Sequence, residues 1–196
     1  MDDEERKHGM SLSGHARNRH DEQIEEGRGI DEYAVLDFEA SSLSVASWPI
    51  EVGLSWFENG EVQTWSSLIR PAARWDRSDW SEQSAAVHRI SFSELEDAPC
   101  PIDVATELFS RLGNRILLSD APTFEVRWLG SLLDAARYTK AVLPVQNYHD
   151  ASFALFEGFA LDMLYETLER RVAPHRAGPD SARLARAWLV AVRYSR

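Results

Sequence analysis

The sequence YAVLDFE (residues 33–39) decides the fold, because an apolar run leads directly into two acids that are separated by one residue. Such a run is typical of a buried strand. Side chains alternate along a strand, so Asp37 and Glu39 share one face. Two adjacent acids repel one another and are costly to desolvate, and they therefore call for a compensating cation such as a divalent metal ion. The alternative is a strand that ends in solvent at Asp37.

The composition is that of an ordinary globular protein, with 196 residues of which 44% are hydrophobic. Cys100 is the single cysteine, which excludes an internal disulfide and a cysteine-rich zinc site. No apolar run has the length of a membrane span, so no membrane partner is expected. The acidic start, MDDEE, has neither the positive charge nor the apolar core of a secretory signal, and the expected location is the cytoplasm.

The formal net charge of −11 argues against a protein that wraps a long duplex by charge neutralisation. The charge is uneven, however, since residues 165–196 contain seven arginines and three acids. A basic C-terminal face beside an acidic metal site could hold a small anionic substrate. A solvated helix surface would have the same composition.

Residues 1–30 are polar and densely charged, without apolar periodicity. They are predicted to be a disordered leader, or in part sequence added for expression. Residues 31–196 are predicted to form one domain.

The pattern after the first strand predicts a mixed sheet covered by helices. Asn59-Gly60 separates two strand-like runs, which is the strongest short signal for a hairpin. The fold class is therefore α/β, with a five-stranded mixed sheet whose three N-terminal strands are antiparallel. The later elements are expected as helices near 102–112, from 123, over 153–171 and from 179, and as strands at 115–119 and 142–145.

A second chemical signal is HRAGPD (residues 175–180), in which a histidine in a glycine- and proline-bearing loop precedes an acid by five residues. Asp180 lies on the expected first turn of a helix, where the backbone field favours an ionised carboxylate. A loop histidine titrates near neutrality, as a general base should. A capping acid next to a surface histidine would give the same pattern.

Together these motifs resemble the DEDDh family of 3′–5′ exonucleases, which includes the proofreading subunit of bacterial DNA polymerase III, oligoribonuclease and RNase T. The likeness covers residues 32–192 and rests on the order of the motifs as well as on residue type. It implies an RNase H-like fold. The matching segments are DFEASSL (37–43), HRIS (88–91, with Arg89 in place of a glycine), DAPTFE (120–125) and HRAGPD (175–180).

The second motif departs from the family pattern, His-Asn-x-x-Phe-Asp. Glu125 stands where the family has its metal-linked aspartate, and Asp120-Ala121 stands in place of His-Asn. Glu125 is the preferred ligand of a second metal, because its Phe-Glu-x-x-Trp-Leu context matches the family helix. Asp120 is the alternative, and loss of one metal with weak activity is a third reading.

The resemblance implies hydrolysis of a terminal phosphodiester with two divalent ions, Mg²⁺ or Mn²⁺. Asp37 would bridge both ions, Glu39 and Asp180 would complete the ligands of the first ion, and Glu125 would support the second ion. His175 would take the proton from the attacking water.

The nucleotide would be held by four further residues, again by analogy with the family. Leu43 would wedge against the terminal base, and Ser41, Ser42 and His88 would line the pocket. Among the tryptophans, only Trp48, Trp75 and Trp80, which lie outside the regular elements, are candidates for stacking on a base. Trp128 is assigned to the core.

The expected function is thus a metal-dependent 3′–5′ exonuclease acting on single-stranded RNA or DNA 3′ ends or short oligonucleotides, with release of nucleoside 5′-monophosphates. One alternative is a nucleic-acid-binding module on the same fold with weakened catalysis. Another is an endonuclease or phosphotransferase of the wider RNase H-like group. The sequence does not distinguish RNA from DNA, and a homodimer is compatible with it.

Overall fold

The structure is a computed structural model, and it describes residues 29–138 and 143–195. The predicted leader falls on residues 1–30, of which residues 1–28 lie outside the described part. A short 3₁₀ turn, Ile30–Glu32, leads into the first strand. The single domain over 31–196 stays a prediction.

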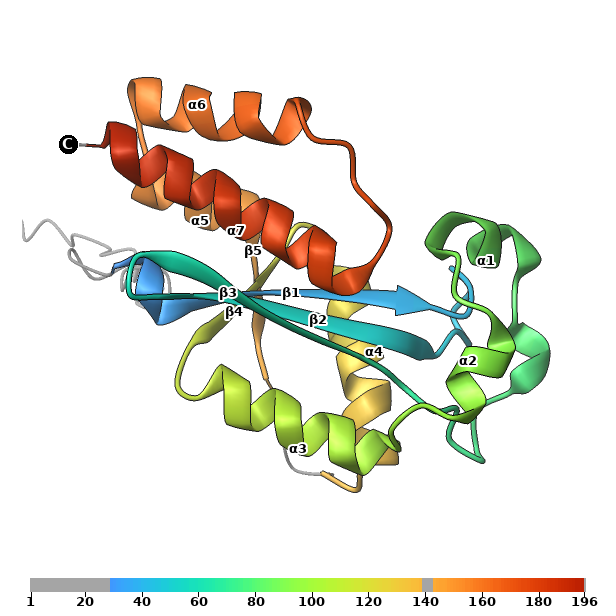
Figure 1. The fold of residues 1–196 in the computed structure, drawn as a ribbon. Helices are drawn as coiled ribbons and strands as arrows, with labels where there is room; N and C mark the ends of the chain where they lie inside the picture. Colours follow the sequence, from blue (N-terminus) through green and yellow to red (C-terminus); the bar gives the residue numbers. More distant parts are fainter. Residues whose placement is uncertain (1–28, 139–142, 196) are drawn as a thin grey trace, which may run out of the picture.

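A five-stranded mixed sheet with the order β3-β2-β1-β4-β5 forms the centre of the molecule (Figure 1). The first three strands pair antiparallel, whereas β4 runs parallel to β1 and β5 runs parallel to β4. The predicted sheet is therefore confirmed. The strands are β1 (Tyr33–Ala40), β2 (Pro49–Glu58), β3 (Glu61–Leu68), β4 (Ile116–Ser119) and β5 (Val145–Asn147).

Helices cover both faces of this sheet, with α3 and α4 on one face and α5, α6 and α7 on the other (Figure 1). The short helices α1 and α2 lie beyond the end of the sheet where β1 finishes (Figure 1). Their bounds are α1 (Glu82–His88), α2 (Phe92–Glu96), α3 (Pro101–Leu112), α4 (Pro122–Ala135), α5 (Tyr148–Leu155), α6 (Gly158–Glu169) and α7 (Ala177–Tyr194).

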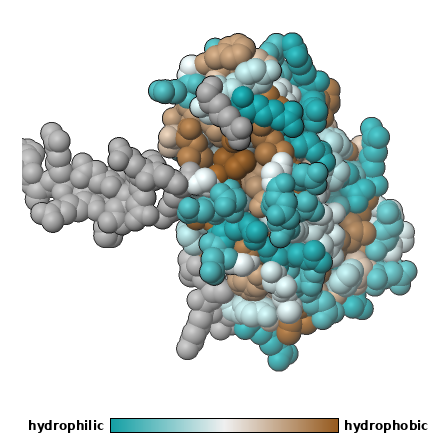
Figure 2. All heavy atoms as spheres, turned by 60° about the vertical axis from the view of Figure 1, so that its left-hand side comes forward, coloured by the Kyte–Doolittle hydropathy of each residue, from teal (hydrophilic) through white to brown (hydrophobic). Residues whose placement is uncertain are grey.

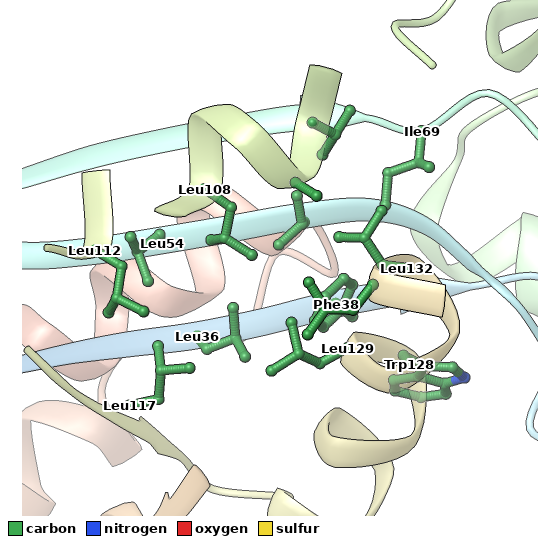
Figure 3. Packing of buried hydrophobic residues seen from close by; sticks show 14 of the residues in the cluster. Leu36, Phe38, Leu54, Ile69, Leu108, Leu112, Leu117, Trp128, Leu129 and Leu132 are labelled. Carbon is green, nitrogen blue, oxygen red and sulfur yellow. The ribbon is translucent and has the colours of Figure 1, made fainter. Parts of the chain in front are cut away.

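Alternation along β1 divides its side chains between the two layers of the fold. Leu36 and Phe38 point into the core between the sheet and helices α3 and α4, where they lie near Leu108 and Leu129 (Figure 3). Tyr33 and Val35 face α5, α6 and α7 and belong to a second apolar cluster. Asp37 and Glu39 continue this second face, so the strand that begins in a core ends in an acidic site beneath α7.

The hairpin between β2 and β3 forms at the predicted turn. Asn59 and Gly60 both have positive φ, 54° and 77°, as a two-residue type I′ turn requires. The predicted helices at 102–112 and from 123 are confirmed as α3 and α4.

Two predicted elements were placed wrongly. The last strand is Val145–Asn147, so residues 143 and 144 of the predicted strand 142–145 precede it, because Pro144 has no N–H to offer a strand ladder. Residue 142 lies outside the described residues. The helix expected over 153–171 is two helices, α5 and α6. The chain turns between them at Gly158, which has φ 52°.

The surface seen in Figure 2 is mostly hydrophilic, with a smaller area in which hydrophobic side chains gather. Exposed aromatic residues include Phe153, Phe159 and Tyr194, which lie on α5, α6 and α7 respectively. Within the described residues, no helix combines the length and the apolar character needed to cross a membrane.

Candidate active site

Three acids from widely separated parts of the sequence lie together where β1 ends. Asp37, Glu39 and Asp180 each offer a carboxylate oxygen, and these oxygens lie within 4.8 Å of one another. Two of the acids come from one face of β1, and the third comes from the first turn of α7. The sequence predicted this grouping, and the structure brings the three residues together.

The electrostatics of these acids favour a cation among them. Burial, followed by the charges of Glu39 and Asp180, raises the pKa of Asp37 well above its usual value. Burial and the charges of Asp180 and Glu51 raise the pKa of Glu39 to about 8. Each acid therefore disfavours ionisation of the next, and a positive ion among them would relieve that repulsion.

Asp180 is 9% exposed, and only one of its oxygens is satisfied within the described protein. The backbone N–H of Arg176 donates to its Oδ2 at 3.1 Å. Its Oδ1 is buried and has no hydrogen-bond partner among the described residues. Burial raises the pKa of Asp180, against the Arg176 hydrogen bond and the nearby His175, which lower it.

Glu125 completes the acidic centre from the first turn of α4 and is 2% exposed. Burial, then the charges of Asp37 and Asp120, raise its pKa well above the usual value, against a hydrogen bond from the Phe38 backbone. Its Oε2 lacks a partner among the described residues, as Asp180 Oδ1 does. Asp120, the alternative ligand, lines the same cavity but is exposed to solvent.

All of these acids line one cavity of about 360 Å³. That volume lies within the range of small-molecule sites. His175, Leu43, Ser42 and His88 line the same cavity, so most of the predicted nucleotide-binding residues surround the acids.

His175 reaches this cavity from the loop between α6 and α7. It is exposed, and its backbone adopts the left-handed conformation with φ 56°. That turn directs the chain into α7, five residues before Asp180. A solvent-accessible imidazole next to the acidic centre is suited to exchange a proton with a water molecule there.

The loop after β1 is organised by Asp79. The hydroxyls of Ser41, Ser42 and Ser44 all donate to its carboxylate, at 3.2, 2.7 and 2.6 Å. Ser41 is fully buried and does not line the cavity, whereas Ser42 does. These bonds hold Leu43 with 74% of its surface exposed, at the edge of the cavity.

His88 lines the cavity and has one ring nitrogen without a partner among the described residues. Its Nδ1 accepts from the Ile90 backbone at 3.0 Å, which places the proton of the neutral ring on Nε2. Nε2 is buried and has no partner within the described chain. Burial lowers the pKa of His88, so the ring stays neutral near pH 7.

The sequence missed several cavity residues, above all Phe124 and Trp128. Both line the cavity from α4, with ring centroids 5.5 Å apart. Their spacing of four residues on a predicted helix was a signal that they share a face. Trp128 also packs in the core, with its Nε1 donating to Ser47 at 2.9 Å.

The tryptophans expected to stack on a base lie elsewhere. Trp48 is 1% exposed and stacks on Trp75 at 5.7 Å, with Trp80 packed against it. None of the three lines the cavity. They support the α1–α2 region from within, because an apolar cluster is needed there to cover the end of the sheet.

The predicted basic C-terminal face is partly used for internal contacts. Arg176 pairs with Glu51, and Arg170 pairs with Glu166. Arg183 lines the cavity but donates to the carbonyls of Arg171 and Leu168, at 2.7 and 3.0 Å. These carbonyls lie at the C-terminal end of α6, so Arg183 fixes the start of the loop that carries His175.

The donor set fits divalent metal ions. Hard cations such as Mg²⁺ and Mn²⁺ prefer carboxylate oxygens. The buried unpartnered oxygens of Asp180 and Glu125 can donate lone pairs to such ions, and the raised pKa values of the four acids indicate that a positive charge would stabilise their ionised forms.

No protein-family model matches the sequence, and no curated protein matches it in a sequence comparison. Solved structures do match. A full-length 3′-exonuclease has a TM-score of 0.59 at 16% identity, with 83% of this chain and 82% of that chain covered. The nuclease domain of 3′hExo, a DEDDh family member bound to rAMP, has a TM-score of 0.59 at 17% identity, with 83% and 92% covered.

Exonuclease I from E. coli, in complex with a dT13 oligonucleotide, also matches, with a TM-score of 0.57 at 13% identity. The match covers 83% of this chain and 41% of that one. At such identities the likeness shows a shared fold. The chain therefore has the RNase H-like fold of the DEDDh exonucleases, as the motifs predicted.

Proposed function

We propose that this protein is a metal-dependent 3′–5′ exonuclease that releases nucleoside 5′-monophosphates from single-stranded ends or short oligonucleotides. One observation carries the proposal: Asp37, Glu39 and Asp180 converge within 4.8 Å, in a cavity that Glu125 and His175 also line. A binding site for a neutral ligand would have no use for four neighbouring acids with raised pKa values.

Asp37, Glu39 and Asp180 would hold one divalent ion, Mg²⁺ or Mn²⁺, and Glu125 would hold a second together with Asp37. Bound there, the pair of ions supplies charge stabilisation for the attacking and leaving oxygens of an in-line displacement. Asp120 is the alternative ligand for the second ion, and its exposure counts against that role.

The protein's own residues would do the rest. His175 takes a proton from the attacking water, since it is the exposed imidazole at the cavity. Leu43 packs against the terminal base, and His88 lines the nucleotide pocket. Ser42 and Ser41 shape the loop that presents Leu43, through their bonds to Asp79.

The structural neighbours support a nucleic-acid substrate. One was solved with rAMP, another with a dT13 oligonucleotide, and Exonuclease X, with a TM-score of 0.52, was solved with 5′ overhanging duplex DNA. For this chain, the choice between RNA and DNA, a homodimeric state and a cytoplasmic location stay predictions.

A nucleic-acid-binding module with weakened catalysis is the second candidate. The observation that favours it is the altered second motif, in which Asp120-Ala121 and Glu125 replace the family residues. Such a protein would hold a 3′ end in the cavity and release it uncut.

A digestion panel separates the two candidates. Purified protein is incubated with Mn²⁺ or Mg²⁺ and end-labelled dinucleotides, single-stranded RNA, single-stranded DNA and duplexes, with Asp37→Ala as the control. The exonuclease proposal predicts stepwise shortening from the 3′ end, with nucleoside 5′-monophosphates identified by mass spectrometry. Binding of intact strands without any shortening would favour the second candidate.

A further inference from the structure

Glu51 is an acid without a role in the proposed chemistry, yet it is 3% exposed and lies beside the acidic centre. In the antiparallel register it pairs with Glu39, while the next residue on its face, Gly53, pairs with Asp37. Burying another carboxylate next to three others is costly. Its contacts must therefore compensate for its position.

Those contacts all go to the residues that join His175 to Asp180. Arg176 donates to Glu51 through Nε at 2.9 Å and through its terminal NH₂ at 2.8 Å. The Ala177 backbone N–H donates to the same carboxylate at 3.0 Å. A guanidinium bound through two parallel hydrogen bonds is fixed in direction as well as in place.

The same face of β2 carries the first turn of α7. A Cβ on Gly53 would lie 2.1 Å from the carbonyl oxygen of Ala177, so the two backbones touch directly. Ser55 is hydrogen-bonded to Ser181 at 2.9 Å. Three successive same-face residues, 51, 53 and 55, thus set the position of this turn, and Glu51 is the one whose partners, Arg176 and Ala177, directly follow His175 in the chain.

The two charges of the pair act in opposite directions on Glu39. Glu51 raises the pKa of Glu39, and Arg176 lowers it. The pair also fixes the geometry of the loop before α7. Arg176 transmits that geometry, because its backbone N–H also donates to Asp180 Oδ2 at 3.1 Å.

We infer that Glu51 and Arg176 form a positioning pair, which holds Asp180 and His175 in the arrangement that metal binding and catalysis require. The inference rests on the proposed function and names residues that act on its site from outside the metal ligands. It predicts that the two parallel hydrogen bonds from Arg176 to Glu51, called the fork below, contribute to metal binding and catalysis in addition to the charges of the two residues.

Arg176→Lys tests the fork, because lysine keeps the charge but cannot make two parallel hydrogen bonds. The primary measurement is Mn²⁺ affinity by isothermal titration calorimetry without substrate. A positioning pair predicts affinity weakened by about tenfold in this variant. An effect of charge alone predicts no change.

For Arg176→Gln, the two explanations predict opposite changes in Mn²⁺ affinity. Removal of a positive charge beside a cation site should tighten Mn²⁺ binding if only charge matters. Loss of the positioning contact should weaken it, again by about tenfold. Equal or tighter binding in both variants overturns the inference.

Kinetics on a labelled single-stranded oligonucleotide provide a second readout. With Mn²⁺ at saturation, Arg176→Lys should lower kcat by about tenfold or more and change KM by less than about twofold, because the strand still binds while Asp180 and His175 are misplaced. A loss confined to KM would contradict a positioning role.

Tyr148→Phe is the matched structural control. The buried Tyr148 hydroxyl donates to the Leu184 carbonyl at 2.9 Å, so its removal loosens α7 away from the first turn. This variant should lose thermal stability while Mn²⁺ affinity and kcat stay at wild-type values. Equal losses in the control and in Arg176→Lys would assign the Arg176 effect to general stability and overturn the inference.

Failure of the proposed function would look different. A wild-type protein that binds Mn²⁺ but cleaves no strand defeats the exonuclease proposal, and the calorimetry of the variants still decides the positioning pair. A wild-type protein that binds no Mn²⁺ overturns both.

Discussion

Glu125 occupies a position where a charged carboxylate is costly. It is 2% exposed, one of its oxygens has no partner within the described residues, and the charge of Asp37 raises its pKa. Asp120, by contrast, is exposed to solvent. The need for a cation is therefore greater at Glu125, which makes it the better candidate for the second metal.

Glu125→Gln should lower kcat by roughly 10²-fold or more, because a metal ligand loses its charge. Asp120→Asn is the matched change at the competing position and should lower kcat by less than about fivefold. Both are measured with Mn²⁺ at saturation on a single-stranded oligonucleotide. A larger loss in Asp120→Asn would transfer the ligand role to Asp120.

His175→Ala should lower kcat by roughly 10²-fold or more, because the attacking water loses its general base. His149 offers a control, since it stacks on Tyr165 with a hydrogen bond of 3.0 Å and does not line the cavity. His149→Ala should leave kcat unchanged. If His175→Ala cleaves at the wild-type rate, the histidine has no part in the chemistry.

The sequence predicted the candidate site residues whose type and spacing indicate a chemical role. Asp37 and Glu39 followed from alternation along a strand, and Asp180 followed from its place at a helix start. Glu51 was missed, because a glutamate in a strand gives no sign of whether an arginine 125 residues later will pair with it. That pairing depends on how α7 lies on β2, and no local pattern encodes it.

At the scale of elements, the residue that ends α1 carries backbone strain. Arg89 stands where the DEDDh motif that the sequence resembles has a glycine, and it closes α1 in the left-handed conformation with φ 58°. A side chain in that conformation costs about 1 kcal/mol or more relative to glycine. The strain lies one residue from His88.

Arg89→Gly should therefore raise the melting temperature by roughly 2 to 4 °C, which corresponds to about 1 kcal/mol for a protein of this size. Thermal unfolding followed by circular dichroism measures it. Arg89→Ala is the control, because alanine removes the side chain but keeps the Cβ that makes this backbone unfavourable. An equal gain in both variants would assign the effect to the arginine side chain.

Elements were predictable wherever a local signal fixed both ends. The Asn59-Gly60 turn defined the β2–β3 hairpin, and Gly113 marked the end of α3. The break between α5 and α6 was missed, because Phe156 and its neighbours continue an apolar pattern although Gly158 turns the chain. Apolar residue types report burial only in part here, since Phe156 is buried beside the break whereas Phe159 is 63% exposed.

For the whole molecule, the acidic centre makes the metal-free fold sensitive to pH. Glu39, with a pKa of about 8, stays largely protonated at neutral pH in the folded protein, whereas the unfolded chain has released that proton. The folded state thus binds more protons, so its stability falls as pH rises towards about 8. His88, whose pKa is lowered, acts in the opposite direction only in more acidic solution.

In a chelator, the melting temperature should accordingly fall by roughly 3 to 5 °C between about pH 6.5 and about pH 8. Saturating Mn²⁺ should abolish the fall, because the ion binds the deprotonated acids. Glu39→Gln is the control, since it cannot titrate and should make the fall in the chelator smaller. A melting temperature that is constant or rises over this range would contradict the raised pKa.

The direct contact between Gly53 and Ala177 has a consequence for mutational scanning. With a Cβ only 2.1 Å from the Ala177 oxygen, no side chain fits at position 53 without moving the helix that delivers Asp180. A selection for activity would then score Gly53 as intolerant as Asp37, although it has no functional group. Ranking positions by tolerance alone would count this glycine as catalytic, and only its steric contact explains the result.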